Sequence, residues 1–380
     1  MSFLSLGLSA PLLKAVAAQH YETAYPIQRE AIPAILKGKD VFGIAQTGSG
    51  KTAGFVLPLL ELYQGRRAAK NRYVNALILV PTRELAMQVG DVFKLFGANL
   101  PRKIKTVAVY GGVSINPQMM ALQGADILVA TPGRLLDLIS SKAVHLSEVE
   151  TLVLDEADKM LNLGFKEEMD KIFALLPERR QNILFSATLG DAVDAIRENL
   201  LHDPVRVEIE AESKTPDLIK QLAYQVAAER KGPLLRYIIK QHDMQQVLVF
   251  VSSTRTADNL VEKLLKNGIE AAAMHSKKSQ GARTEGLSKF KSGKLRVLVA
   301  TDLASRGIDI QSLPYVINYD LPRSPKDYIH RIGRTGRAAS EGEAISLICP
   351  EDSHHFKIIQ KKMGKRVEII ETDNLDLKGY

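Results

Sequence analysis

The stretch Ala45–Thr52, which reads AQTGSGKT, constrains this chain more than any other feature. It follows the apolar run Val41–Ile44 and precedes a segment that fits a helix. This strand, loop and helix match a phosphate-binding loop, although alanine replaces the usual first glycine. Backbone N–H groups of such a loop hold phosphates, its lysine reaches the β- and γ-oxygens, and its hydroxyl suits Mg²⁺. We therefore expect a nucleotide site formed by Gly48, Ser49, Gly50, Lys51 and Thr52.

A second apolar run, Thr151–Leu154, leads directly into the sequence Asp-Glu-Ala-Asp. A carboxylate at the end of a buried strand suits the residue that holds Mg²⁺ near phosphates, and the next carboxylate suits a base for water. We assign these roles to Asp155 and Glu156. The alternative is a glycine-rich turn and an acidic loop that share no function.

Composition limits the classes of protein that remain. The 380 residues are 45% hydrophobic, and a chain of this length is more typical of two domains than of one. Every apolar run is shorter than the roughly twenty residues of a membrane span, and the first residues lack the basic region of a signal peptide. The single cysteine, Cys349, excludes an internal disulfide and fits a reducing compartment. We expect a soluble, cytoplasmic protein.

The net charge of +8 lies entirely in the second half of the chain. Residues 1–210 contain 23 basic and 23 acidic residues, whereas residues 211–380 contain 28 and 20. A basic domain is the usual electrostatic signature of polyanion binding, although a solvated basic surface gives the same bias.

The order of the apolar runs predicts two α/β domains. Continuous rather than alternating apolar runs indicate strands that are buried on both faces. In the first half we expect strands at Val41–Ala45, Ala76–Val80, Val107–Tyr110, Ile127–Ala130, Leu152–Leu154 and Ile183–Phe185, with helices at Arg83–Phe96 and Phe165–Leu176. In the second half we expect strands at Val247–Val251, Ala271–Met274, Val297–Ala300, Val316–Tyr319 and Ala344–Ile348, with helices at Thr256–Lys266 and Gln280–Phe290.

The predicted fold class is therefore α/β, with two tandem doubly wound parallel-sheet domains that face each other across a cleft. We place the first domain at residues 1–207, a polar linker at 208–216, the second domain at 217–362 and a short C-terminal tail at 363–380.

Short motifs follow the expected strands, at the sheet edge where doubly wound proteins bind ligands. Glycine, threonine and arginine at such turns offer N–H, hydroxyl and guanidinium groups to phosphates, although ordinary turns and helix caps use the same residues. The motifs are Pro81-Thr82-Arg83, Gly111-Gly112, Thr131-Pro132-Gly133-Arg134, Ser186-Ala187-Thr188 and the run from Thr301 to Asp309.

The segment Tyr328–Arg337 contains three arginines within seven residues. Two glycines make it a poor helix, so we expect a basic turn that presents guanidinium groups. Because the phosphate-binding loop has no arginine beside it, the cluster suggests arginine fingers delivered by the opposite domain. A solvated basic loop is the alternative.

Together these motifs make the chain resemble a DEAD-box RNA helicase of helicase superfamily 2, in the short bacterial branch of that family. The likeness runs motif by motif from Phe3 to about Ile359. It implies two RecA-like domains that bind ATP and Mg²⁺ between them and single-stranded RNA across both. It further implies an RNA-dependent ATPase that opens short RNA duplexes locally and is nearly blind to base sequence.

The resemblance also implies roles for single residues. For the nucleotide these are Phe3 and Gln28 at adenine, Lys51 and Thr52 at phosphate and Mg²⁺, Asp155 at Mg²⁺, Glu156 at the attacking water and Asp309 at the ribose. Arg334 and Arg337 would be the fingers and His330 a bridge to the first domain, while Asp158, Ser186 and Thr188 would couple the ATP site to strand separation. RNA contacts would come from Pro81, Thr82, Arg83, Gly112, Thr131, Pro132, Gly133, Arg134, Ser253, Thr254, Arg255, Gln280, Arg283 and Thr301.

The chain departs from the family pattern before Gln28, where His20, Ala24 and Tyr25 stand in the usual places of glycine, proline and threonine. Other functions remain open at this point: a DNA-directed translocase of the same superfamily, or an ATP-gated RNA clamp or assembly scaffold with incidental turnover. A P-loop GTPase fits poorly because no Asn-Lys-x-Asp occurs to read guanine. We expect a monomer away from membranes, and the sequence does not identify its RNA or any partner in ribosome assembly or RNA decay.

Overall fold

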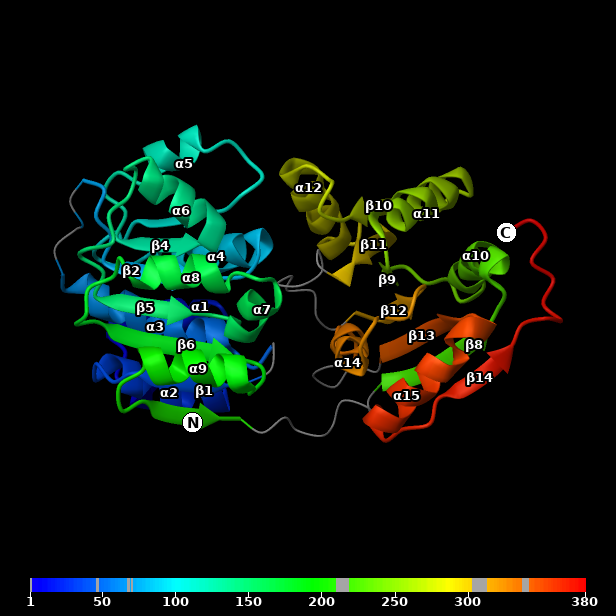
Figure 1. The fold of residues 1–380 in the computed structure, drawn as a ribbon, viewed down its shortest axis with the longest axis horizontal. Helices are drawn as coiled ribbons and strands as arrows, with labels where there is room; N and C mark the ends of the chain where they lie inside the picture. The colour runs from blue at the N-terminus through cyan, green and yellow to red at the C-terminus, as the bar shows by residue number, and fades with distance from the viewer. Residues whose placement is uncertain are drawn as a thin grey trace. The chain divides into compact units, whose positions relative to one another are not determined.

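The computed structural model describes residues 2–45, 48–66, 69, 71–209, 219–302, 313–336 and 342–380. The chain divides into two compact units, Met1–Ala211 and Glu212–Tyr380. Each unit is built on one seven-stranded parallel sheet with helices on both of its faces (Figure 1). The predicted α/β class, with two tandem doubly wound parallel sheets, is confirmed.

The sheet of the first unit has the strand order β3-β4-β2-β5-β6-β1-β7. Its strands are β1 (Val41–Ile44), β2 (Ala76–Leu79), β3 (Thr106–Val109), β4 (Ile127–Ala130), β5 (Thr151–Leu154), β6 (Gln181–Ser186) and β7 (Val205–Glu208). Its helices are η1 (Phe3–Leu6), α1 (Ala10–Ala18), α2 (Pro26–Leu36), α3 (Lys51–Gln64), α4 (Arg83–Gly97), α5 (Asn116–Ala121), α6 (Pro132–Ser140), α7 (Ala157–Asn162), α8 (Lys166–Phe173) and α9 (Asp191–Leu200).

The sheet of the second unit has the order β10-β11-β9-β12-β13-β8-β14. Its strands are β8 (Ile219–Gln225), β9 (Val247–Val251), β10 (Ala271–Met274), β11 (Val297–Thr301), β12 (Tyr315–Asn318), β13 (Gly342–Ile348) and β14 (Glu368–Glu371). Its helices are η2 (Ala228–Arg230), α10 (Lys231–Gln241), α11 (Thr254–Lys266), α12 (Gln280–Lys291), α14 (Pro325–Ile332), η3 (Pro350–Asp352) and α15 (Ser353–Met363). The two orders are the same pattern, with β8 in the place of β1 and β14 in the place of β7.

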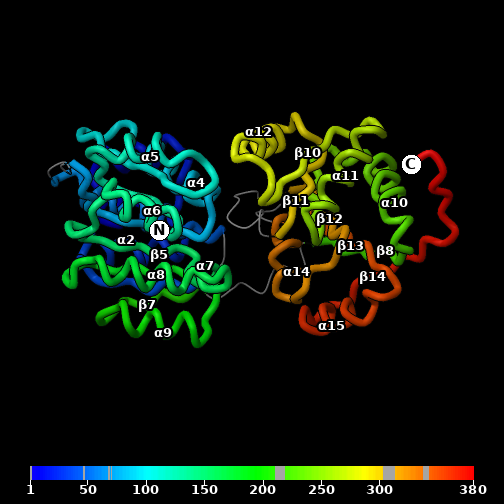
Figure 2. Tube along the Cα trace, turned by 45° about the horizontal axis from the view of Figure 1, so that its top comes forward, coloured from blue at the N-terminus to red at the C-terminus, as the bar shows by residue number. Residues whose placement is uncertain are grey.

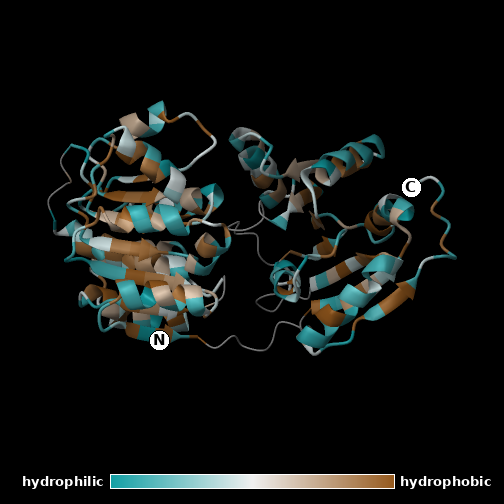
Figure 3. Cartoon of the chain, in the orientation of Figure 1, coloured by the Kyte–Doolittle hydropathy of each residue, from teal (hydrophilic) through white to brown (hydrophobic). Residues whose placement is uncertain are grey.

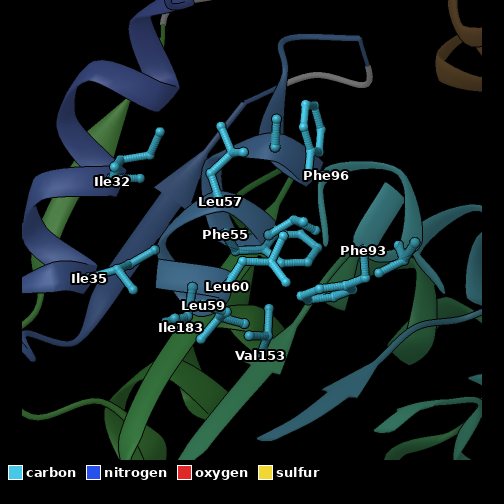
Figure 4. Close-up of a cluster of buried hydrophobic side chains, with 14 of the residues drawn as sticks. Ile32, Ile35, Phe55, Leu57, Leu59, Leu60, Phe93, Phe96, Val153 and Ile183 are labelled. Atoms are coloured by element: carbon cyan, nitrogen blue, oxygen red, sulfur yellow. The ribbon is translucent and has the colours of Figure 1, made fainter. Parts of the chain in front are cut away.

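Successive residues of the central strands enter two different cores. Val153 and Ile183 belong to the core under α2, α3 and α4, where Phe55 packs above them (Figure 4). Leu152 and Leu184 belong to the core on the opposite face of the same sheet. This double burial is the physical reason for the continuous apolar runs. Figure 3 shows the result, with hydrophobic strands inside each unit and hydrophilic residues on the outer sides of the helices.

Of the three strands that the sequence analysis did not predict, β8 is internal to its sheet, whereas β7 and β14 lie at corresponding edges of the two sheets. Three residues of β7 are exposed, and none of the four residues of β14 is fully buried. Edge strands of this kind are short and carry charged side chains. They therefore lack the continuous apolar run on which the prediction depended. Glu208, where we expected the linker to begin, is the last residue of β7.

The C-terminal segment, residues 363–380, which we expected to be a short tail, packs on the second unit. Its strand β14 pairs with β8, and the Thr372 hydroxyl then donates to the Gln225 carbonyl at 2.6 Å. The segment continues beside α10, where the rings of Tyr380 and Tyr237 lie 5.1 Å apart between centroids (Figure 2). β14 takes the edge position in the second sheet that β7 takes in the first. The C-terminal segment thereby completes the second sheet and covers the edge of β8. Within the described ranges, every helix is too short or too polar to cross a membrane.

Candidate active site

The phosphate-binding loop joins β1 to α3, as the sequence predicts. The helix begins at Lys51, and Gly50 is its N-cap. Gly48 and Gly50 have φ angles of 85° and 86°, in the left-handed region that favours glycine. Ser49, between them, is half-buried. Residues 46–47 lie outside the described residues. The loop therefore places its glycines and the start of a helix at the end of a buried strand.

The Lys51 side chain is buried at the start of α3, with 6% of its surface exposed. Its Nζ donates to the Ala45 carbonyl at 2.6 Å. Burial lowers the pKa of Lys51, and the charges of Asp155 and Glu156 oppose that effect. Thr52, the next residue, is half-buried. The loop and the acidic motif therefore share one electrostatic environment, which excludes the alternative in which they are unrelated.

Asp155 directly follows β5, and its N–H donates to the Leu79 carbonyl at 3.0 Å. The residue is 2% exposed, and Glu156 is 4% exposed. Burial raises the pKa of Asp155 to about 6, while Lys51 acts in the opposite direction. Within the described part of the chain, Asp155 Oδ1 and Glu156 Oε2 have no hydrogen-bond partner. Buried carboxylate oxygens without a partner are costly, so this pair indicates a site for a ligand.

These donors fit a Mg²⁺ ion that is held largely by a nucleotide. Mg²⁺ keeps several waters and binds through one or two carboxylates together with phosphates. The residues that the structure describes contain no group of three or more His, Cys, Asp or Glu that could enclose a metal. Asp155, with its buried Oδ1 that has no partner among the described residues, fits as one such carboxylate, and the Thr52 hydroxyl stays a predicted ligand.

Asp158 connects the acidic motif to the residues that follow β6. Its Oδ2 accepts from the Thr188 hydroxyl at 2.9 Å. Thr188 is tied in turn to Ser186, whose hydroxyl donates to the Thr188 carbonyl at 2.7 Å. β5 and β6 are neighbours in the sheet. The structure therefore brings together Asp158, Ser186 and Thr188, which the sequence analysis grouped for coupling.

Gln28 lies in α2 with its side chain fully buried. Its Oε1 accepts from the Tyr25 N–H at 2.9 Å, and its Nε2 donates to the Gly50 carbonyl at 3.0 Å. The amide thus holds both the start of α2 and the phosphate-binding loop. Its adenine contact stays a prediction, and any such contact requires these bonds to be exchanged or shared.

Aromatic side chains lie near the beginning of the chain. Phe3 is 3% exposed, and its ring centroid lies 6.3 Å from that of Tyr21. Both residues line a cavity of about 360 Å³, together with Leu13, Val16 and His20. His20 has a φ of 57°, a left-handed value that explains why glycine is usual there.

Two of the RNA residues predicted in the first unit, Arg83 and Arg134, contact the loop after β3. Thr82 caps α4 by accepting from the Leu85 N–H at 3.2 Å. Gly112 has a φ of 77° and lies against the Arg83 guanidinium, which leaves no room for a Cβ. Arg134 of α6 donates to the Val113 carbonyl at 2.9 Å. The other predicted contacts, Pro81, Thr131, Pro132 and Gly133, lie at the starts of the same helices, α4 and α6.

In the second unit, the predicted RNA residues follow three adjacent strands, β10, β11 and β9. Ser253 caps α11, accepting from the Thr256 N–H at 3.0 Å. Thr301 is the last residue of β11. Gln280 and Arg283, in the first turn of α12, are largely buried. Thr254 and Arg255 begin α11. Because parallel strands end at one edge, these residues lie at the same side of the sheet.

The prediction of a basic turn at Tyr328–Arg337 is wrong for its first part, which is the helix α14. Arg331 is 3% exposed. Its guanidinium binds the Asp302 carboxylate and the Asn318 amide oxygen. These bonds to a half-buried carboxylate and a buried amide anchor the segment as a helix, and its two glycines, Gly333 and Gly336, follow the end of that helix at Ile332. The exposed His330 is also helical, Arg334 follows the helix, and Arg337 and Asp309 lie outside the described residues.

Two further residues escaped the sequence analysis. Lys159 forms a buried ion pair with Glu156 at 2.5 Å. Asp320 accepts from the N–H and the hydroxyl of Ser252, at 2.8 and 2.9 Å, and so fixes the loop that leads into α11. Both resemble ordinary surface charges in the sequence, and their burial or partners are visible only in the fold.

Two family descriptions match the chain: DEAD/DEAH box helicase over residues 25–196, and helicase conserved C-terminal domain over residues 230–339. The DEAD-box ATP-dependent RNA helicase CshA of Bacillus cereus is 40% identical over 376 residues, which cover 99% of this chain and 70% of that protein. CshA of Streptococcus pneumoniae is 42% identical over 369 residues, which cover 97% of this chain and 69% of that protein.

Solved structures give the same result. Saccharomyces cerevisiae Dbp5 bound to RNA and ADP BeF3 has a TM-score of 0.84 at 32% identity, covering 100% of this chain and 97% of that one. A DEAD box protein from the hyperthermophile Methanococcus jannaschii is 36% identical with a TM-score of 0.54, covering 97% of this chain and 99% of that one.

Proposed function

The chain belongs to the DEAD-box family of ATP-dependent RNA helicases, and we propose that it couples ATP hydrolysis to the binding of single-stranded RNA and the local opening of short RNA duplexes. The observation that carries this proposal is the buried acidic corner beside the phosphate-binding loop. There Asp155 Oδ1 and Glu156 Oε2 have no partner among the described residues, within electrostatic reach of Lys51.

In the proposed site, Gly48, Ser49 and Gly50 direct backbone N–H groups at the phosphates of ATP. Lys51 exchanges its bond to the Ala45 carbonyl for the β- and γ-oxygens. Thr52 and Asp155 would hold Mg²⁺, which supplies neutralisation of the charge that develops on the phosphates. Glu156 takes a proton from the attacking water. We place the adenine at Phe3 and Gln28, of which Gln28 contacts Gly50 of the loop.

Hydrolysis in this proposal needs residues from both units. Phosphoryl transfer depends on positioning and charge stabilisation, and an arginine finger is a large part of both. We assign this role to Arg334 and Arg337, with His330 as a bridge and Asp309 at the ribose. Asp158, Ser186 and Thr188 would transmit the state of the nucleotide, since they form one hydrogen-bonded group.

The proposed RNA residues favour recognition of the strand backbone. Helix starts, glycines and arginines are suited to phosphates, and hydroxyls are suited to the 2′-OH. This chemistry occurs at Thr82, Arg83 and Arg134 in one unit and at Ser253 and Thr301 in the other. Because such contacts avoid base edges, we expect little sequence preference.

The test compares ATP hydrolysis without nucleic acid, with single-stranded RNA and with DNA of the same sequence, alongside separation of a short RNA duplex. We expect RNA, but not DNA, to stimulate ATP hydrolysis, and we expect the short RNA duplex to be separated. Glu156→Gln is the matched inactive control, because an amide keeps the shape but cannot accept the proton. Equal stimulation by DNA would indicate a DNA-directed enzyme. ATP-dependent RNA binding without strand separation would indicate a clamp or scaffold.

A monomer working in the cytoplasm remains part of this proposal. RNA as the substrate supports that location. Sedimentation of the pure protein with and without RNA would test the oligomeric state.

A further inference from the structure

The catalytic base proposed above is held by a lysine on its own helix. Lys159 Nζ lies 2.5 Å from Glu156 Oε1, and the side chains are 10% and 6% exposed. Glu156 is the N-cap of α7, and its backbone is left-handed, with φ 56° and ψ 46°. Such a conformation is rare for a residue with a side chain and persists only where neighbouring contacts hold it.

The ion pair makes the two oxygens of this carboxylate unequal. Oε1 is occupied by Lys159. Oε2 is buried, and the described residues offer it no hydrogen-bond partner. In a hydrolytic site, the nucleophile is activated by a base, and a third group typically orients that base by binding the atom that does not take the proton. The Lys159 ammonium is in the position of that third group, and Oε2 is the oxygen left for water.

The burial of this pair argues against a purely structural role. Transferring an ammonium and a carboxylate from water into the protein interior is costly. Replacing such a buried ion pair by apolar residues of similar size often leaves the stability of the folded state unchanged or increases it. The next helix shows the ordinary alternative. There Lys166 and Asp170 form a pair at 2.9 Å with side chains that are 69% and 56% exposed. Exposed pairs of that kind contribute little to stability.

We propose that Lys159 is a positioning residue for the base: it holds Glu156 Oε1 so that Oε2 faces the water that attacks ATP. The inference rests on the proposed function, in which Glu156 is the base. In that step, Oε2 takes the proton as the water oxygen bonds to the γ-phosphorus. The bond from that phosphorus to the bridging oxygen breaks, and its electron pair leaves on ADP. Lys159 keeps its proton throughout.

The test is Lys159→Met in the full chain, which keeps the apolar stem and removes the charge. At saturating ATP and RNA, we expect kcat to fall about tenfold to hundredfold, because a loosely held base spends less time in productive geometry. KM for ATP should stay within about twofold of the wild-type value, and so should RNA affinity with a non-hydrolysable ATP analogue. Lys159→Arg should restore much of kcat. The matched control is Lys166→Met, which breaks the exposed pair and should leave kcat unchanged.

An unchanged or raised kcat in Lys159→Met would overturn the proposal, and a raised value would mean that the lysine restrains the base. Equal losses in kcat and in analogue-dependent RNA affinity would also overturn it, because they would indicate a collapsed site. If Lys159→Met melts early, Lys159→Gln replaces it: the shorter, neutral amide holds Oε1 more weakly than the ammonium does, so kcat should fall, though by less than in a variant that cannot donate. A wild-type protein without RNA-stimulated hydrolysis would instead refute the proposed function.

Discussion

Arg331 binds both carboxylate oxygens of Asp302, with Nε to Oδ1 at 2.6 Å and Nη2 to Oδ2 at 2.7 Å. The same guanidinium donates from Nη1 to the Asn318 side chain at 3.0 Å and to the Asp320 carbonyl at 2.6 Å. One arginine of α14 therefore ties together the segments that follow β11 and β12. Asp320 also holds Ser252, so this network reaches the loop before α11.

We predict that Arg331→Ala and Arg334→Ala fail in different ways. Removing one partner of a fully buried ion pair costs about 3–5 kcal/mol. The Asp302 side chain is 33% exposed and therefore partly screened by water, so Arg331→Ala should lower the free energy of unfolding by a smaller amount, roughly 2 kcal/mol. Arg334→Ala should destabilise the protein much less and instead lose on the order of 10³ in RNA-stimulated ATP hydrolysis, if it is a finger. Urea unfolding and ATPase assays on both variants would show this. Similar unfolding midpoints would contradict the structural role given to Arg331.

This pair of arginines shows what the sequence could and could not predict. Arg331, Arg334 and Arg337 look alike in a basic, glycine-containing segment. Among the described residues, burial distinguishes Arg331 from the half-buried Arg334, and the burial of Arg331 depends on Asp302, which follows β11, and on Asn318, the last residue of β12. Lys159, which follows the three acidic residues of Asp-Glu-Ala-Asp, likewise looks in the sequence like a solvated charge on a helix, and only the structure shows that it is buried against Glu156.

The fold was more predictable than the site because the burial of the central strands is visible in the sequence as unbroken apolar runs. Residues such as Leu152 and Val153 enter opposite cores, so an unbroken apolar run is required there. β8 mixes buried positions with half-buried and exposed ones instead, and β7 and β14 are largely exposed. Those strands were missed because their positions in the sheet do not demand continuous apolar residues.

The two glycines that flank α3 form a matched test of the phosphate-binding loop. Gly50 has a φ of 86°, and a Cβ there would lie 2.5 Å from Gln28 Nε2 and 2.9 Å from the Tyr25 ring. Gly65, at the other end of the helix, has a φ of −82°, and a Cβ there would meet nothing within 4 Å. Gly50→Ala should therefore displace the loop and weaken ATP binding by about tenfold or more, at a cost of about 1–2 kcal/mol in backbone strain.

Gly65→Ala should bind ATP normally and unfold at the same or a slightly higher temperature, because alanine restricts the unfolded chain. Calorimetric titration with ATP and thermal melts of both variants would test the pair. Normal ATP affinity in Gly50→Ala would show that the loop tolerates a side chain and that its left-handed glycine is dispensable.

Tyr328 should make the stability of the second unit depend on alkaline pH. Its side chain is fully buried, with the hydroxyl 3.1 Å from the Ser346 Oγ, and burial raises the pKa of Tyr328 to about 12. The unfolded chain releases this proton first, near its ordinary pKa of about 10. The contribution of the neutral phenol is therefore complete below pH 10 and is lost as pH rises towards 12.

Tyr328→Phe removes that titration and the hydrogen bond, so it should cost about 1 kcal/mol at pH 8. The difference in unfolding midpoint between the two proteins should shrink as pH rises above 10 and change sign before pH 11.5, because the roughly 2 kcal/mol lost through the titration exceeds the hydrogen bond's contribution. Other buried tyrosines titrate in both proteins and cancel in the comparison. A difference that stayed constant with pH would show that Tyr328 does not titrate on unfolding.

Gln28 offers the sharpest test of nucleotide recognition, because its amide already holds two protein groups. Its Oε1 accepts from the Tyr25 N–H, and its Nε2 donates to the Gly50 carbonyl. If the amide also binds adenine, Gln28→Ala should weaken ATP binding about tenfold or more but GTP binding only a few-fold. A site that hydrogen-bonds one base rejects another because the wrong base leaves polar groups of the site without a partner. Selectivity for ATP should then collapse. Competition of both nucleotides against a fluorescent ATP analogue would measure the two affinities. Equal losses for ATP and GTP would show that Gln28 acts only by supporting Gly50, and that the base is recognised elsewhere.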